Sequence, residues 1–219
     1  MISLSRKEIQ TKRMWMYFVN ATVEIIEKEG IEGVTARKIA DRAGYTSSTI
    51  YNYFGELSHL IFFASMRFVN DYIQEVPTYM SKGVNYLEKY LLSWECLCKH
   101  SFTRPEIYHA VFIANLGGKP QELLDHYYSV YQSDLIGFPD DLKPLILEHN
   151  LIKRNQALLE MASKENIVRP ENIEEVNDII ILIWEGMITT LLNQRRDYEL
   201  EEAIEKTMRY INKIASKLL

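Results

Sequence analysis

Residues 30–60 constrain this chain more than any other stretch, because they carry two short helical segments joined by a tight turn at Gly44. Ile39 and Ala40 precede Ala43 at helical spacing, and Gly44 then permits a backbone conformation that is costly for other residues. Thr46 is a suitable N-cap for the second segment, whose apolar residues then face inward. The pattern predicts a helix-turn-helix, in which the second helix enters the major groove of DNA.

The second helical segment begins with small polar side chains, which suit the end of a helix that approaches base edges. These residues are Thr46, Ser47, Ser48 and Thr49. A polar surface turn between two ordinary helices remains the alternative on spacing alone, since short helix pairs are common in all-helical proteins.

The region of about residues 10 to 60 resembles the N-terminal signature of the TetR-type transcriptional regulators. The resemblance is carried by Val34–Ala40 (VTARKIA), Ala43-Gly44 and Thr49–Phe54 (TIYNYF). Two positions depart from the family pattern. Ser48 stands where glycine or alanine is usual, and Leu57 stands where a lysine usually grips a DNA phosphate.

The resemblance implies an all-α fold with two domains. Residues 1–55 would form a three-helix, helix-turn-helix DNA-binding domain, and residues 56–219 a helical domain for effector binding and dimerisation. The chain would bind a palindromic operator in double-stranded DNA as a homodimer, act as a repressor by default, and be released by a small apolar or aromatic molecule. The alternative is a TetR-like protein-interaction or ligand-carrying module that has lost DNA binding, a reading that Leu57 favours and the intact Thr49–Phe54 run opposes.

The resemblance also implies roles for individual residues of the head. Bases would be read by Thr46, Ser47, Ser48 and Asn52, and the DNA backbone would be held by Thr35, Arg37, Tyr51 and Tyr53. Thr49, within the same run, belongs to the DNA-binding set.

Charge is unevenly distributed along the chain. The 219 residues have a net charge of −5; residues 1–60 hold eight Lys and Arg against seven Asp and Glu, which leaves 17 against 23 in the remainder. A local positive excess is formed by Arg6, Lys7, Lys12 and Arg13, opposed only by Glu8. These residues predict either an arm ahead of the first helix that reaches DNA or a solvated, frayed terminus.

Several other classes of protein find little support. No run approaches the roughly 18 apolar residues of a membrane span, and the N-terminus lacks a signal-peptide core, so a cytoplasmic protein without a membrane partner is expected. Cys96 and Cys98 are too few for a disulfide scaffold. Cys96 and His100 share a helix face, but no third ligand stands at a recognisable spacing, so neither a metal nor a cofactor is expected. Motifs for catalysis are missing, and an enzyme is not expected.

The chain beyond the head predicts helix after helix, separated by Gly and Pro. The expected ranges are Glu56 to Val76, Val84 to His100, Glu106 to Leu116, Gln121 to Ile136, Leu142 to Lys164, Ile173 to Arg195 and Glu199 to Leu218. The first should end before Pro77, and Asn172 with Glu175 should cap the penultimate helix.

The penultimate helix is apolar on more than one face, so its own domain cannot cover all of it. In the family that the chain resembles, the last two helices pair with their copies in a second subunit. The expected interface residues are Trp184, Ile188, Leu191 and Leu192. A fully internal helix in a monomer is the alternative.

The middle helices mix aromatic and polar side chains, and the family resemblance places a small-molecule cavity in this region. Buried phenols need hydrogen-bonding partners, so some of the fourteen tyrosines should line a cavity or a wet interface. The expected effector-binding residues are Trp94, Tyr108, His109, Phe112, Asn115, Tyr127 and Tyr128.

Overall fold

The computed structural model describes residues 6–117 and 120–219, and within these ranges the chain forms helices and turns without a strand. The all-α fold class predicted from the sequence is confirmed. The chain divides into two compact units. The first comprises the described residues up to Phe68 together with Ala114–Gln132, and the second comprises Val69–Ile113 and Ser133–Leu219.

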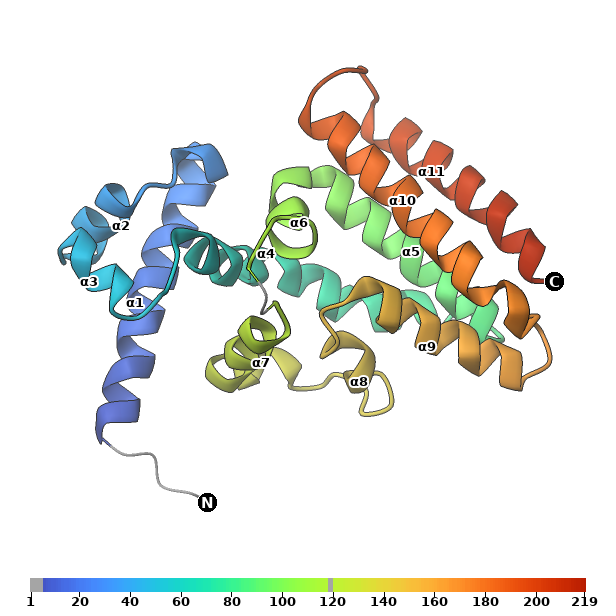
Figure 1. The fold of residues 1–219 in the computed structure, drawn as a ribbon, viewed down its shortest axis with the longest axis horizontal. Coiled ribbons are helices and arrows are strands. Elements are labelled where there is room, and N and C mark those ends of the chain that lie inside the picture. Colours follow the sequence, from blue (N-terminus) through green and yellow to red (C-terminus); the bar gives the residue numbers. More distant parts are fainter. Residues whose placement is uncertain (1–5, 118–119) are drawn as a thin grey trace. The chain divides into compact units, whose positions relative to one another are not determined.

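The first unit contains the helices drawn in blue and cyan in Figure 1, together with α7. Its elements are α1 (Arg6–Glu29), a 3-10 turn (Ile31–Gly33), α2 (Ala36–Ala43), α3 (Ser47–Tyr51), the first half of α4 (Leu57–Met80) and α7 (Pro120–Val130). An aromatic cluster forms the core. The ring of Trp15 lies 4.2 Å from that of Phe54 and 4.5 Å from that of Phe63, between centroids. Burial of these large rings fixes α1 against the turn that follows α3.

The second unit is a bundle in which α5 packs against α9 and α11, and α10 also packs against both of these helices (Figure 1). Its elements are the second half of α4, α5 (Tyr86–Thr103), α6 (Pro105–Phe112), α8 (Lys143–Ile146), α9 (Leu151–Lys164), α10 (Ile173–Leu192) and α11 (Leu200–Ala215). Short 3-10 turns at Gln132–Leu135, Pro170–Asn172 and Ser216–Leu218 complete the chain.

Trp184 lies at the centre of the second unit, with no exposed surface. Its ring centroid is 6.3 Å from those of both Trp94 and Phe112. The indole Nε1–H donates to the Oγ of Ser101, also fully buried, at 2.9 Å. This bond satisfies the only polar group that the indole brings into the core.

Several helix boundaries differ from those predicted. The helix α4 does not end before Pro77 but continues to Met80. Proline costs that helix one backbone hydrogen bond, but Val76 and Met80 are both buried, and this apolar packing extends the helix past the missing bond. The single helix expected from Leu142 to Lys164 is wrong, because α8 and α9 are separate and Asn150 caps the second of them by accepting from the N–H of Ile152 and Lys153.

The predicted capping pair at Asn172 is also wrong. The Asn172 side chain makes no cap bond and instead donates to the carbonyl of Lys217 at 2.9 Å. The helix expected from Gln121 to Ile136 ends at Val130 and gives way to a 3-10 turn. Gly118, within a predicted loop, lies outside the described residues.

The basic residues near the N-terminus belong to α1 and do not precede it, which corrects the predicted arm. Lys12 shows why the helix extends this far, because its ammonium group donates to the carbonyl of Ser129 on α7 at 2.9 Å. The side chain of Glu8 lies outside the described residues.

Ser101→Ala should lower the free energy of unfolding by about 1–3 kcal/mol, because it leaves the indole N–H of Trp184 buried without an acceptor. Urea denaturation would measure the change. Ser93→Ala is the matched control, since the Ser93 hydroxyl donates to a carbonyl of its own helix, that of Tyr90. An equal loss in the two variants would contradict the role assigned to the Trp184–Ser101 bond.

Candidate functional site

The turn between α2 and α3 is built by backbone hydrogen bonds and a left-handed glycine. Thr35 caps α2 by accepting from the N–H of Lys38 at 3.2 Å. Gly44 ends α2 with φ 77° and ψ 31°, a conformation that L side chains rarely adopt, and its N–H and that of Tyr45 both donate to the carbonyl of Ala40. The side chain of Ile50 is buried and holds α3 against the core of the first unit. The predicted pair of short helices is therefore present.

The N-terminus of α3 carries a small hydroxyl cluster. Thr46 is the N-cap, but its Oγ1 lies 2.9 Å from both the Oγ of Ser48 and the Oγ1 of Thr49, and it makes no cap bond to the backbone. Hydroxyls that satisfy one another in this way can rotate to donate to or accept from a base edge. The hydroxyls at this end of α3 are thus hydrogen-bonded to one another in the free protein and can still turn towards DNA.

Most of the residues expected to contact DNA have accessible side chains. Those exposed are Thr35, Arg37, Thr46, Ser48, Tyr51 and Asn52, and those partly buried are Ser47, Thr49 and Tyr53. Arg37 lies 3.9 Å from Asp41, and both side chains are so exposed that this ion pair contributes little to stability. Arg37 is free to exchange this partner for a phosphate.

Other charges of the head are engaged within it. Arg42 bonds to Glu24 at 2.9 Å, and Lys38 bonds to Glu29. The hydrogen bond and charge of Lys38 lower the pKa of Glu29. Leu57, the first residue of α4, adds no charge at a helix end where a lysine would face a phosphate in the family pattern.

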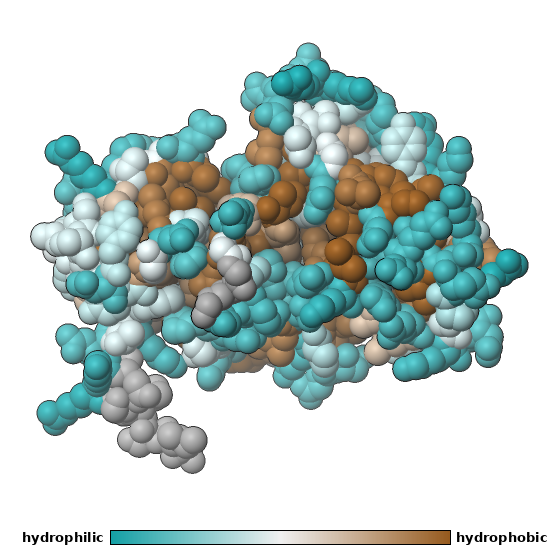
Figure 2. All heavy atoms as spheres, in the orientation of Figure 1, coloured by the Kyte–Doolittle hydropathy of each residue, from teal (hydrophilic) through white to brown (hydrophobic). Residues whose placement is uncertain are grey.

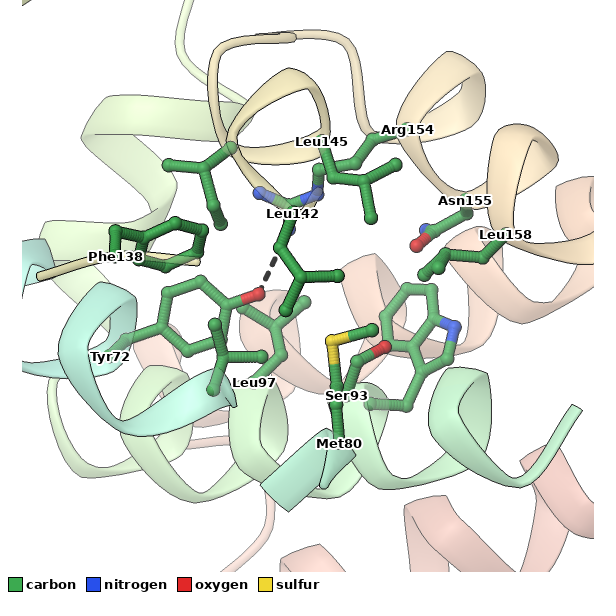
Figure 3. A pocket seen from close by; sticks show the side chains of 13 residues that line it. Tyr72, Met80, Ser93, Leu97, Phe138, Leu142, Leu145, Arg154, Asn155 and Leu158 are labelled. Atoms are coloured by element: carbon green, nitrogen blue, oxygen red, sulfur yellow. Dashed lines mark hydrogen bonds between the residues drawn. The ribbon is translucent and has the colours of Figure 1, made fainter. Parts of the chain in front are cut away.

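The second unit holds a small cavity of about 20 Å³, room for a single water molecule. Aliphatic and aromatic side chains form most of its wall (Figure 3). The lining residues are Tyr72, Val76, Met80, Ser93, Trp94, Leu97, Phe138, Leu142, Leu145, Ile146, Arg154, Asn155 and Leu158. They come from α4, α5, α9 and the segment around α8.

Arg154 is the unusual member of this wall, because it is a cation with only 7% of its surface exposed. Its Nη2 donates to the hydroxyl of Tyr72 at 3.1 Å, and burial raises the pKa of that phenol while the guanidinium opposes the rise. No carboxylate lies within 4 Å of Arg154 among residues 6–117 and 120–219. Next to it, the buried Nδ2 of Asn155 has no hydrogen-bond partner among those residues. The cavity thus presents donors to an apolar space.

The seven residues expected to bind the effector divide between the two units. Trp94, Tyr108, His109 and Phe112 lie in the second unit, whereas Asn115, Tyr127 and Tyr128 lie in the first. Of the seven, Trp94 lines the cavity. The Tyr127 hydroxyl accepts from Arg67 at 3.2 Å, and the side chain of Asn115 accepts from the N–H of Gly117 at 2.9 Å.

Sequence reasoning missed Arg154, although a signal was present. Leu151, Arg154, Asn155 and Leu158 follow the three- and four-residue steps of one helix face, so a charged and an amide side chain interrupt an apolar stripe. A charged side chain on the buried face of a helix is costly, so it is expected to pair with an opposite charge or to bind a ligand.

The four residues expected at a subunit interface differ in exposure. Trp184 and Ile188 have no exposed surface within the unit, whereas Leu191 and Leu192 are partly exposed. As packed, Trp184 and Ile188 present no surface of their own to a second subunit, and the interface stays a prediction. Apolar surface is instead offered by Leu182 of α10, which is 65% exposed, and Figure 2 shows apolar atoms along this helix.

Cys96 and His100 were expected to share a helix face without a third ligand. The structure supplies one, because Glu75 of α4 brings a carboxylate oxygen to them, and the three potential ligand atoms all lie within 4.8 Å of one another. Glu75 could not be selected from the sequence, since it lies on a different helix, 21 residues before Cys96.

Among the described helices, none is long and apolar enough to cross a membrane.

Residues 18–60 match the model of the bacterial regulatory proteins of the tetR family. An HTH-type transcriptional regulator of Staphylococcus aureus (strain bovine RF122 / ET3-1) is 24% identical over 117 residues, which are 51% of this chain and 63% of the relative. The chain thus spans less than two thirds of that relative's length.

Solved structures agree over nearly the whole chain. FadR of Thermus thermophilus, a TetR family transcriptional repressor in complex with lauroyl-CoA, has a TM-score of 0.58 at 14% identity and covers 94% of this chain and 95% of its own. RolR in complex with resorcinol has a TM-score of 0.60 at 13% identity, covering 96% and 95%. FadR of Bacillus subtilis in complex with stearoyl-CoA has a TM-score of 0.57 at 13% identity, covering 94% and 100%.

The short helices, the glycine turn and the exposed polar end of α3 define a helix-turn-helix protein. The matched segment carries the helix-turn-helix signature of the tetR family, and TetR-type regulators of known structure share the fold of the whole chain, so the resemblance predicted from the sequence is confirmed.

Leu57→Lys should add one phosphate contact for each subunit at the N-terminus of α4. The affinity for DNA should rise, and the slope of log K against log salt should steepen by about 0.9 for each added contact. Fluorescence anisotropy across a salt series would measure the slope. Leu57→Gln is the uncharged control, and a slope that does not differ between the two variants would show that position 57 does not face DNA.

Proposed function

We propose that this chain is a ligand-responsive repressor that binds a palindromic operator as a homodimer. The observation that carries the proposal is the α2–Gly44–α3 turn, with its exposed polar residues at the start of α3. Two copies related by a two-fold axis would place their α3 helices in successive major grooves, about 34–36 Å apart. TetR-type regulators are typically DNA-binding proteins without enzymatic activity, and the function needs no catalytic group.

A homodimer is supported by the apolar surface of α10. Leu182 is 65% exposed, and Gly186, one turn further along the helix, has nothing within 4 Å of the position its Cβ would occupy. Partly exposed apolar residues flank these two on α10 and α11. A second copy packed on this face would bury side chains that water otherwise contacts, and Gly186 would allow close approach of the helices.

The effector that fits the cavity has an apolar body and an anionic end such as a carboxylate. A buried guanidinium without a counter-charge is unfavourable by several kcal/mol, and a carboxylate would accept from it in bidentate geometry. The aliphatic wall would take the remainder of the molecule. Structures with the same fold contain lauroyl-CoA, stearoyl-CoA or resorcinol, and the acyl chain or aromatic ring of these molecules supports a ligand with an apolar body.

Binding requires the cavity to open, since 20 Å³ holds no organic molecule. Figure 3 shows Leu142 over the middle of the cavity, with Leu145 and Phe138 at its wall, and these residues would move first. Tyr72, on α4, would respond to the anion, because its hydroxyl and the anion would both accept hydrogen bonds from Arg154. Through α4, whose first half belongs to the first unit, the ligand would alter the separation of the two heads and release the operator.

The alternative proposal is a module that keeps the fold but does not bind DNA. Leu57 favours it, because this position adds no charge for a phosphate. The exposed residues of α3 and the exposed Arg37 oppose it, since a head without a DNA partner gains nothing from a polar, accessible recognition helix.

Selection from a random duplex library should enrich a palindromic site in the absence of effector. On that site, Tyr51→Phe should weaken binding to all sequences alike, because a phosphate contact carries no sequence information. Asn52→Ala should change which base is preferred, with a loss of roughly 1–3 kcal/mol for the base contact. Enrichment of no palindrome by the unmodified protein would favour the interaction module.

Decanoate should raise the melting temperature of the unmodified protein more than decanol does, because only the acid offers an anion to Arg154. A charged hydrogen bond of about 1.5–3 kcal/mol corresponds to roughly a 10- to 150-fold difference in affinity. Arg154→Met should abolish the difference, and without ligand it should be at least as stable to urea as the unmodified protein, since an unpaired buried charge is removed.

Lys153→Met is the matched control for this experiment, because Lys153 is an exposed neighbour on the same helix. The carboxylate site would be excluded if decanol stabilised the protein as well as decanoate did, or if Arg154→Met kept the preference for the acid.

A further inference from the structure

Three side chains of the second unit converge on one point between α4 and α5. Glu75 comes from α4, and Cys96 and His100 come from successive turns of α5. A carboxylate oxygen, the Sγ and a ring nitrogen lie within 4.8 Å of one another. Cys96 is fully buried, whereas Glu75 and His100 are partly accessible to solvent.

The local packing holds each of these side chains in place. The Oε2 of Glu75 is hydrogen-bonded to the Nε2 of His100, and its Oε1 accepts from the ammonium group of Lys99 at 2.8 Å. These bonds lower the pKa of Glu75, with Lys99 the larger cause, so the carboxylate is charged at neutral pH. The Tyr72 ring lies 6.0 Å from the imidazole between centroids, in a T-shaped arrangement.

We propose that Glu75, Cys96 and His100 bind one Zn²⁺ ion, with a fourth position left to water. Thiolate, imidazole and carboxylate are the protein ligands that zinc takes, and a thiolate favours zinc over magnesium or calcium. The residues at i and i+4 of α5 project from the same face of the helix, and the third comes from the facing helix. None of these three residues lines the cavity that contains Arg154.

Binding requires a change in protonation and in hydrogen bonding. Burial raises the pKa of the Cys96 thiol to about 12, so the free group is protonated. The thiol proton passes to solvent as the S–Zn bond forms, because a coordinating thiol is deprotonated outright. The ion replaces the His100–Glu75 hydrogen bond by a bond to each residue. Lys99 can keep its bond to the other carboxylate oxygen and hold Glu75 in position.

A bound ion would join α4 to α5 by coordination in place of one hydrogen bond. Glu75 lies one helical turn beyond Tyr72, which lines the cavity and accepts a hydrogen bond from Arg154. The ion would therefore fix the half of α4 that belongs to the second unit. Zinc should stabilise the folded chain, since a ligand that binds only the native state adds to its stability.

Cobalt(II) is the probe that tests this site, because its absorption reports the ligands directly. The full chain, kept reduced, should bind one Co²⁺ with a near-ultraviolet band from a cobalt–thiolate bond and visible bands of a four-coordinate ion, and Zn²⁺ should abolish both. Cys96→Ser should remove the thiolate band. Cys98→Ser should retain it, since Cys98 is also a buried free thiol but lies outside the cluster.

Glu75→Gln and His100→Gln should each weaken Co²⁺ binding by more than about tenfold. Loss of a residue that only supports a metal ligand already costs about this much, so loss of a ligand itself should cost more. Circular dichroism would establish that each variant is folded. No thiolate band at millimolar Co²⁺, a band that survives Cys96→Ser in folded protein, or one that disappears in folded Cys98→Ser would overturn the proposal.

Discussion

The structure depends on the burial of one long helix, α4, on more than one side. Leu60 and Phe63 in its first half belong to the core of the first unit, and Val76 and Met80 in its second half line the cavity of the second. Each half of α4 is therefore held by the packing of its own unit. The ligand site and the metal site that we propose both involve residues of the second half.

Buried polar groups in the second unit fall into two kinds. The indole of Trp184 has its acceptor in Ser101, and such a pair stabilises the core. Arg154 bonds to the Tyr72 hydroxyl but has no carboxylate partner in the described part of the chain, and the Nδ2 of Asn155 has no hydrogen-bond partner there. A buried charge without a counter-charge lowers the stability of the fold, so its presence at position 154 indicates a functional role such as ligand binding. This contrast, more than the size of the cavity, distinguishes the site from ordinary core.

The head could be predicted from the sequence because its signals are local. Gly44 ends α2 in the left-handed conformation, and Thr46 begins α3, where turn chemistry and capping decide the structure. The remaining site depends on contacts distant in sequence. Arg154 meets Tyr72 across 82 residues, a separation that helical periodicity cannot encode.

The helix boundaries that were predicted incorrectly have the same origin. Asn172 has the side chain of a helix cap, and yet the carbonyl of Lys217 binds it, because tertiary contact overrides local preference. At Pro77, apolar burial outweighs the loss of one backbone bond. The split of the expected effector residues between two units arises in the same way, since their clustering along the sequence gave no information on which core each would join.

The central claim is that two heads bind one operator together. Native mass spectrometry of the protein with its selected duplex tests it most directly, by counting chains on the DNA. The account predicts two chains for each palindrome, and it predicts that Leu182→Glu, which places a charge in the subunit contact, is monomeric and loses this complex while remaining folded. One chain bound at undiminished affinity, or a Leu182→Glu complex that still holds two chains, would contradict it.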